Sequence, residues 1–236
     1  MPADLDFSNP AGLTSLPFPS PLPLPFERFE VVTRNDVNYF QYMGRSKFGE
    51  LSRRMGHANF MEGYEKLYLY GTSGSGKSHI LAALACKLIR EGERVVYVPD
   101  CATLLDDFEW AIRTALCCAF YDSPLLETIE SALDFDALLR FWRQQRKLYF
   151  IVDQLNALEL GGRHASLDEV KEKATQRLHQ MQIHHKYIFS ASANEKSDVQ
   201  ANMKQGGITV IRFLGGMSKV CNAFKYCPIY YITHII

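Results

Sequence analysis

The chain has 236 residues, of which 47% are hydrophobic and 22% are charged, and this composition is typical of a globular protein rather than a disordered or fibrous one. Its 26 basic and 26 acidic residues give a formal net charge of zero, so there is no global electrostatic reason to expect a nucleic acid or an anionic membrane as partner. Since no run approaches the roughly 18 apolar residues of a membrane span and no secretory signal opens the chain, we expect an intracellular protein without a membrane partner.

The first 25 residues hold seven of the ten prolines. Proline fixes φ and lacks an N–H donor, so the alternating Leu-Pro and Phe-Pro run of residues 16–25 predicts extended polyproline II chain rather than a helix or a central strand. We therefore expect residues 1–25 to form a disordered leader, with a docking segment as the alternative. Residues 26–65 are expected to be a helical entry segment, with short helices at 35–43 and 45–55.

The strongest motif matches G-x-x-x-x-G-K-[ST] and lies between an apolar strand expected at 66–70 and a helix expected at 79–90. Its glycines allow the backbone N–H groups to wrap around an anion, and the helix that follows adds the positive end of its dipole. We expect Lys77 to contact the β/γ-phosphates of a nucleotide and the Ser78 hydroxyl to take one Mg²⁺ position. The alternative, a Gly/Ser-rich surface turn, does not explain the strand and the helix on either side. The residues of this phosphate loop are Gly71, Thr72, Ser73, Gly74, Ser75, Gly76, Lys77 and Ser78.

Beyond the loop, strands and helices alternate, as in a parallel sheet covered by helices on both faces. The sequence predicts an α/β P-loop NTPase domain over residues 66–217, with a central parallel five-stranded sheet in the order 5-1-4-3-2, where strand 1 is 66–70. Residues 218–236 lack helical and strand periodicity and are expected to be an unstructured or aberrant tail. The other strands are expected at 94–98, 148–152, 187–191 and 208–213, and further helices at 102–119, 134–146 and about 166–184.

An acidic residue, Asp153, directly follows the buried strand expected at 148–152. The carboxyl ends of parallel strands lie along one edge of the sheet, beside the phosphate loop. We therefore expect Asp153 to hold Mg²⁺ through a water, together with Ser78, and we expect ATP and Mg²⁺ as the ligands. The alternative is a loop aspartate that caps the next segment.

The residue after Asp153 is Gln154, where many ATPases of this type carry a glutamate. An amide orients a water but does not take its proton, and the loss of a general base typically costs about 10²–10⁴-fold in rate. We expect slow hydrolysis in which Lys77, Gln154 and Asp100 are the catalytic residues. Asp100 is the expected base and Glu159 is the next candidate, while for both acids a solvated loop position is the alternative.

A polar cluster ends the strand expected at 187–191. In related sheets a polar side chain at this place contacts the γ-phosphate, and Ser192 and Asn194 both meet that requirement. Ordinary turn chemistry explains a serine or an asparagine at a strand end equally well. We expect Ser192 to be part of the nucleotide site.

With the phosphate loop, Val96 to Cys101, Phe150 to Leu158 and Phe189 to Asn194 in place, the chain resembles the P-loop module of fungal Crinkler (CRN-type) effector proteins. The resemblance covers residues 26–217 and implies that the Asp153-Gln154 pair is a family trait. It also implies an export header and a nuclease-like domain, neither of which this sequence shows. The residues that match the family are Lys77, Ser78, Asp153, Gln154 and Ser192.

The resemblance implies a Mg²⁺-dependent nucleotide switch or slow ATPase that regulates an effector activity. A protein partner or a second copy of the chain is then expected, with nucleic acid as a partner only if a separate nuclease domain acts in trans. A secreted effector acting in a host cell becomes the alternative localisation. Two other functions stay open: a non-enzymatic nucleotide-binding scaffold, and a small-molecule kinase, which the lack of an arginine-rich lid after residues 148–152 disfavours.

Overall fold

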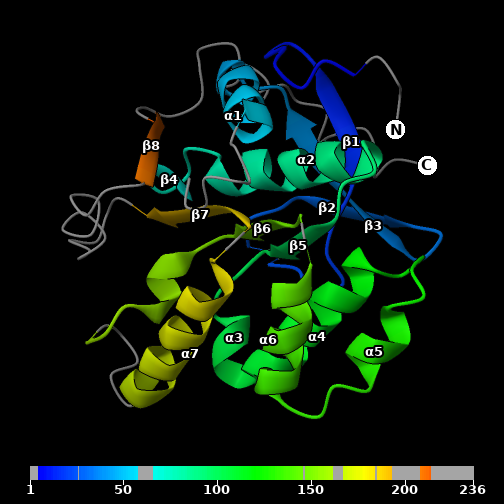
Figure 1. The fold of residues 1–236 in the computed structure, drawn as a ribbon. Helices are drawn as coiled ribbons and strands as arrows, with labels where there is room; N and C mark the ends of the chain where they lie inside the picture. Colours follow the sequence, from blue (N-terminus) through cyan, green and yellow to red (C-terminus); the bar gives the residue numbers. More distant parts are fainter. Residues whose placement is uncertain are drawn as a thin grey trace, which may run out of the picture.

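The computed structural model describes residues 5–25, 27–57, 66–145, 147–161, 167–183, 185–192 and 208–213. At its centre lies a five-stranded sheet in which every neighbouring pair of strands is parallel (Figure 1). The strand order is β5-β6-β7-β4-β8. The bounds of these strands are β4 Lys66–Gly71, β5 Val95–Val98, β6 Tyr149–Val152, β7 Lys186–Ser192 and β8 Ile208–Phe213.

This sheet confirms the fold class and the five strands predicted from the sequence. Counted from β4, the observed order is the predicted 5-1-4-3-2. The labels run higher because three strands that the sequence analysis did not predict come before β4. The expected tail at 218–236 lies outside the described residues.

Helices cover both faces of the sheet (Figure 1). On one face lie α1 (Ser46–His57) and α2 (Lys77–Arg90). The opposite face carries α3 (Thr103–Asp106), α4 (Phe108–Ala119), α5 (Leu126–Glu130), α6 (Phe135–Gln144) and α7 (Asp168–Met181), and one 3₁₀ turn, η2 (Leu155–Leu158), follows β6.

The helix expected at 102–119 is divided into α3 and α4. Asp107 lies between them with extended backbone, at φ −155°, and its side chain accepts a hydrogen bond from Trp110 N at 2.9 Å. An aspartate at this position caps the exposed N–H groups of a new helix, so the chain stops one helix and starts the next at the same residue.

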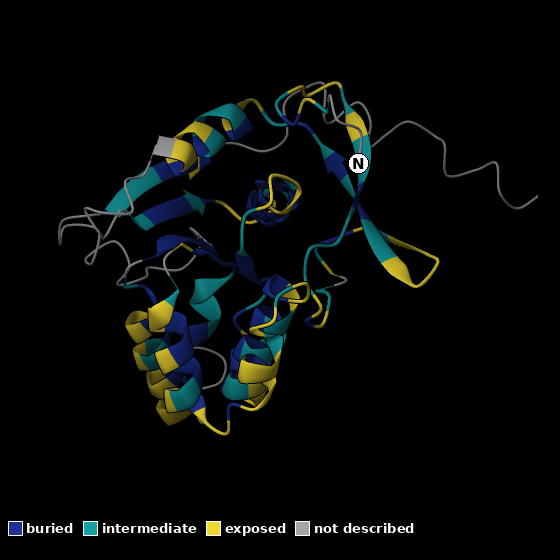
Figure 2. Ribbon diagram, turned by 45° about the vertical axis from the view of Figure 1, so that its right-hand side comes forward, coloured by how far each residue is buried: buried dark blue, intermediate teal, exposed yellow. Residues whose placement is uncertain are grey.

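Successive side chains of a strand point to opposite faces of the sheet. Because helices cover both faces, the side chains on each face are buried. Phe150 and Val152 of β6 pack with the helices α3 to α7, whereas Tyr149 and Ile151 pack with α1 and α2. The molecule therefore has two apolar layers, one on each side of the sheet, and exposed residues lie on the outer faces of the helices (Figure 2).

An antiparallel sheet that the sequence did not predict precedes the central one. This N-terminal sheet consists of β1 (Leu13–Pro17), β2 (Val31–Arg34) and β3 (Val37–Met43), in the order β1-β3-β2. The turn between β2 and β3 is Asn35-Asp36, and both residues have positive φ, 49° and 59°. Such a turn matches the twist of a β-hairpin, and asparagine and aspartate tolerate it well. The helix expected at 35–43 was therefore wrong.

The N-terminal sheet packs against α2 through aromatic and aliphatic side chains. Leu16 and Phe40 are fully buried, and Phe29 lies between Phe40 and His79, with ring centroids at 5.4 and 4.7 Å. The expectation of a disordered leader was wrong for the described part of residues 1–25. Its apolar residues pack against residues that are distant in the sequence, such as those of α2. Proline does not prevent the strand, because β1 lies at the edge of its sheet, where proline is tolerated.

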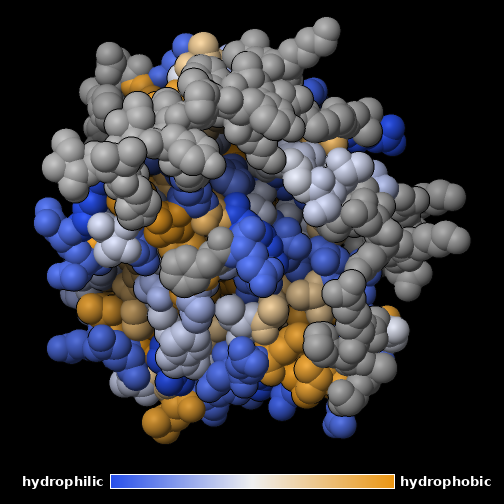
Figure 3. All heavy atoms as spheres, turned by 180° about the vertical axis from the view of Figure 1, so that it is seen from behind, coloured by the Kyte–Doolittle hydropathy of each residue, from blue (hydrophilic) through white to orange (hydrophobic). Residues whose placement is uncertain are grey.

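No described helix is both long and apolar enough to cross a membrane. Several large apolar side chains are nevertheless exposed, among them Trp110 in α4, Tyr121 just after α4, and Leu133 between α5 and α6. Seen from behind, hydrophobic residues lie in separate areas between hydrophilic ones (Figure 3). Scattered apolar side chains of this kind are usual on a protein surface.

Candidate functional site

The phosphate-loop motif lies where the sequence predicts it, between the end of β4 and the start of α2. Gly74 and Gly76 have positive φ, 74° and 86°, a backbone conformation that favours glycine. At Gly76 a Cβ atom would also meet Arg45 Nη2 at 2.6 Å. No described side chain caps the first turn of α2. Its N-terminal N–H groups are thus available to an anion, as the motif requires.

Lys77 is held inside this loop. Its side chain is buried, and Nζ donates to the carbonyl oxygens of Gly71 at 2.7 Å and Thr72 at 2.9 Å. Burial lowers the pKa of the Lys77 ammonium, and the nearby Asp153 carboxylate opposes that change. The two carbonyl contacts fix a cation at the mouth of the loop.

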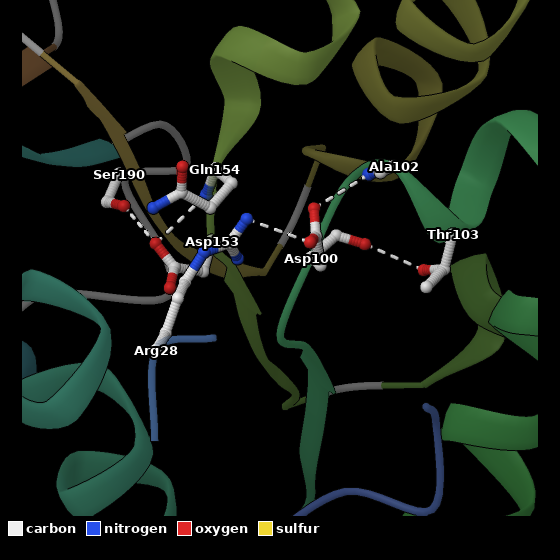
Figure 4. Close-up of polar contacts among 7 residues, drawn as sticks. All are labelled: Arg28, Asp100, Ala102, Thr103, Asp153, Gln154 and Ser190. Atoms are coloured by element: carbon white, nitrogen blue, oxygen red, sulfur yellow. Dashed lines mark hydrogen bonds and ion pairs between the residues drawn. The ribbon is translucent and has the colours of Figure 1, made fainter. Parts of the chain in front are cut away.

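Asp153 is the most confined acid of the site. It is fully buried at the end of β6, where its Oδ1 accepts hydrogen bonds from Ser190 Oγ and from Gln154 N, the latter at 2.9 Å (Figure 4). Burial raises the pKa of this carboxyl, while the Ser190 and Ser78 hydroxyls and then the Arg28 charge oppose the rise. Ser78 thus lies close to Asp153, although Oδ2 has no hydrogen-bond partner among the described residues.

These donors fit a Mg²⁺ ion. The Ser78 hydroxyl and the Asp153 carboxylate are hard oxygen ligands, which Mg²⁺ prefers, and it commonly takes one or two carboxylates together with phosphate oxygens and waters. A buried carboxylate oxygen without a partner is costly unless a cation or a donor satisfies it. Asp153 Oδ2 is such an atom, and it lies beside the loop that would hold the phosphates.

Gln154 adopts left-handed backbone, with φ 60° and ψ 46°. Residues other than glycine rarely adopt this conformation, and it recurs at functional sites that the surrounding structure constrains. Here it turns the chain sharply after β6, so that the Gln154 N–H meets the Asp153 carboxylate. This contact holds the Gln154 backbone against the Asp153 side chain.

Asp100 also lies in the site, at the end of β5, but its carboxylate is engaged. Oδ2 forms an ion pair with Arg28 Nη2 at 2.9 Å, and Oδ1 accepts a hydrogen bond from Ala102 N at 2.9 Å (Figure 4). The ends of β5 and β6 are joined by a hydrogen bond from Cys101 N to Asp153 O at 3.1 Å, which brings Asp100 and Asp153 to the same edge.

The structure describes the three remaining predicted residues, Glu159, Ser192 and Asn194, to different extents. Glu159 follows η2, and its carbonyl oxygen accepts from Lys171 Nζ at 3.0 Å. Ser192 is the last residue of β7, and its side chain lies outside the described part. Asn194 lies outside the described residues altogether.

Sequence reasoning missed three residues of this site: Ser190, Arg28 and Arg45. A polar residue inside the apolar stretch 187–191 of β7, next to the strand that carries Asp153, was a usable signal for Ser190. Nothing in the local sequence marks the two arginines. They come from the N-terminal sheet region, and only the fold brings Arg28 to Asp100 and Arg45 to Gly76.

We expect Asp153→Asn to stabilise the protein when no nucleotide is bound. Because the pKa of Asp153 is raised in the folded state, its charge at neutral pH opposes folding. Removing that charge should increase the free energy of unfolding by about 1–3 kcal/mol, the usual cost of a buried unsatisfied group. Thermal unfolding should show a rise of about 2–4 °C for each kcal/mol.

Asp134→Asn is a matched control, because Asp134 is exposed and its side chain accepts only the capping bond from Ala137 N that an asparagine retains. If Asp153→Asn lowers the melting temperature instead, the carboxylate is needed for folding and the site has been misread.

Comparison with known proteins gives one family match. The model described as IstB-like ATP binding protein matches residues 32–120, less than half of the chain, in a region that includes the whole phosphate loop. This match supports ATP binding. A search of curated proteins found no match.

Solved structures are similar at low levels. DnaA from Aquifex aeolicus bound to AMPPCP is 18% identical, with a TM-score of 0.36, over 70% of this chain and 43% of that one. DnaI is 18% identical, with a TM-score of 0.33, over 72% of this chain and 80% of that one. The chain spans less than half of DnaA, and at these TM-scores the likenesses support no functional conclusion.

The family match corrects the expectation drawn from resemblance. The matching model is the IstB-like ATP binding protein and not a Crinkler effector, so the resemblance to Crinkler proteins was wrong. The expectations that depended on this resemblance, namely an effector activity, a nuclease partner and a secreted localisation, are therefore withdrawn. The nucleotide-binding part of the expectation stands, and the chain contains a P-loop ATP-binding module similar to those of IstB-like proteins.

Proposed function

We propose that this protein is a Mg²⁺-dependent ATP-binding switch that hydrolyses ATP slowly. The observation that carries the proposal is that Lys77, buried in the phosphate loop, lies near Asp153, whose Oδ2 has no partner among the described residues. A cationic side chain that can bind phosphate and a carboxylate that can bind a metal ion thus lie at one edge of the sheet, next to the N-terminus of α2.

In this proposal each residue of the site has one role. Residues 71–78 bind the phosphates through their N–H groups, and Lys77 contacts the β/γ-phosphates. Ser78 and Asp153 would hold Mg²⁺, which when bound neutralises charge on the phosphate oxygens. Gln154 orients the attacking water, and Asp100 accepts its proton. Ser190 keeps the Asp153 carboxylate in place by donating to Oδ1.

A second candidate is a nucleotide-binding scaffold without catalysis. One observation favours it: Gln154 is an amide, and the nearest alternative acid, Asp100, is paired with Arg28. Both candidates require ATP binding and differ in turnover.

Calorimetry of the full chain with ATP, once with Mg²⁺ and once with EDTA, tests the shared claim. Phosphate release with ATP alone then separates the switch from the scaffold. Binding that needs Mg²⁺ together with slow release of phosphate supports the proposal. Binding without any release supports the scaffold, and absence of binding in both solutions contradicts both candidates.

We expect Gln154→Glu to increase ATP hydrolysis at least about tenfold, since a general base contributes about 10²–10⁴-fold. The substitution is nearly isosteric and places a carboxylate beside Asp153, where the water is to be activated. Asp100→Asn should lower turnover, and Gln154→Glu should restore it in the double variant. Steady-state phosphate release measures all four proteins.

The control is Gln144→Glu on the exposed face of α6, which makes the same chemical change away from the site. If the wild type is fast and neither Gln154→Glu nor Asp100→Asn changes its rate, the base lies elsewhere and these assignments are wrong.

A further inference from the structure

The N-terminal sheet region contributes a side chain to the candidate nucleotide site. Arg28 lies between β1 and β2 in a segment fixed on both sides: its N–H donates to Pro25 O at 2.9 Å, and the next residue, Phe29, is buried against His79 of α2. From there the Arg28 side chain passes Asp153 and reaches Asp100 (Figure 4). The helix that starts at the phosphate loop thus also positions Arg28.

Only part of the Arg28 guanidinium is satisfied in the structure. Nη2 pairs with Asp100 Oδ2 at 2.9 Å, whereas Nη1 is buried and has no hydrogen-bond partner among the described residues. A guanidinium has five N–H donors in a rigid plane, and its geometry suits carboxylates and phosphates. A buried donor without a partner is costly, so its presence at a site points to a ligand that would satisfy it.

The second unsatisfied atom lies in the same site and has the opposite charge. Asp153 Oδ2 is a buried acceptor without a hydrogen-bond partner among the described residues, and the Arg28 charge acts on that carboxyl. A ligand satisfies both atoms when it brings a cation or a hydrogen-bond donor to Asp153 and an acceptor oxygen to Arg28. A nucleoside triphosphate would supply anionic oxygens to Arg28, and its Mg²⁺, held by Ser78 and Asp153, would supply the cation.

We propose that Arg28 binds the terminal phosphate of ATP and gives up its ion pair with Asp100 when it does so. The N-terminal sheet would then distinguish ATP from ADP, because ADP lacks the phosphate that Arg28 reaches. This inference rests on the proposed function, since it requires the phosphates to lie in the loop at residues 71–78. It goes beyond that function by assigning nucleotide discrimination to a residue outside the P-loop domain.

Calorimetry of the full chain with Mg²⁺ and either AMPPCP, a non-hydrolysable analogue of ATP, or ADP tests this role. We expect Arg28→Ala to weaken AMPPCP binding at least about tenfold and ADP binding less than about twofold, as the loss of one charge-assisted hydrogen bond implies. Arg34→Ala is the matched control, because it removes an exposed arginine from the nearby strand β2. It should change neither affinity.

A second variant tests the exchange without removing Arg28. Asp100→Asn leaves the guanidinium without its carboxylate partner, so AMPPCP should bind more tightly than to the wild type while ADP binding stays the same. Equal losses for both nucleotides in Arg28→Ala, or unchanged AMPPCP affinity in both variants, overturn the inference alone. Failure of the wild type to bind either nucleotide overturns the proposed function, and this inference with it.

Discussion

Lys77→Ala is expected to weaken ATP binding by about 10- to 100-fold. A charge-assisted hydrogen bond contributes about 1.5–3 kcal/mol, and about 1.4 kcal/mol corresponds to a tenfold change in the dissociation constant. Lys77 already lies in the loop, with Nζ on the carbonyl oxygens of Gly71 and Thr72, so no large rearrangement is needed for it to meet phosphate. Calorimetry with Mg²⁺ and ATP measures the loss.

The matched control is Lys87→Ala, at the other end of the same helix, where the lysine forms an ion pair with Glu91. It removes one positive charge from α2 without touching the loop, and the affinity for ATP should not change. Thermal unfolding of both variants shows whether the fold is kept. If Lys77→Ala binds ATP with unchanged affinity, the assignment of residues 71–78 as a phosphate loop is wrong.

Leu16→Ala is expected to lower the free energy of unfolding by about 2–5 kcal/mol, the usual cost of truncating a buried leucine. Leu16 is fully buried in the cluster that joins the N-terminal sheet to α2. Denaturant unfolding of the full chain measures the change. Such a loss is large for a domain whose total stability is commonly about 5–15 kcal/mol.

Leu13→Ala on the same strand is the control, since Leu13 is 56% exposed and its truncation should cost less than about 0.5 kcal/mol. Equal and small effects at both positions would mean that β1 contributes nothing to stability, and that the proline-rich segment is a leader after all.

The features predicted correctly from the sequence are those encoded locally. The phosphate loop is a contiguous motif, and the strands of the central sheet are short apolar runs with turn residues on either side, so the pattern predicted both the sheet and its order. The position of Asp153 followed from the same logic, since the residue after a parallel strand lies at the edge of the sheet.

The N-terminal region was predicted poorly because its structure depends on partners far away in the sequence. The apolar residues among the prolines looked like those of a disordered leader, but Leu16 is fully buried beside α2. The Asn35-Asp36 turn was a local signal for a hairpin, and the aromatic residues after it also favour a strand, so the hairpin could have been predicted from the sequence. For Arg28, no local pattern distinguishes a residue of the site from an ordinary surface arginine.

Helix α2 carries the phosphate loop at its first residue and the packing surface for the N-terminal sheet along its side. Nucleotide binding and the packing of the N-terminal sheet are therefore thermodynamically linked, because a nucleotide that binds folded α2 also stabilises the sheet packed on it. The same coupling free energy acts in the other direction, from the sheet to the nucleotide. A substitution that loosens the sheet will lower nucleotide affinity without touching the nucleotide. Such an indirect loss affects ATP and ADP alike, so a contact with the nucleotide can be recognised only by a difference between the two.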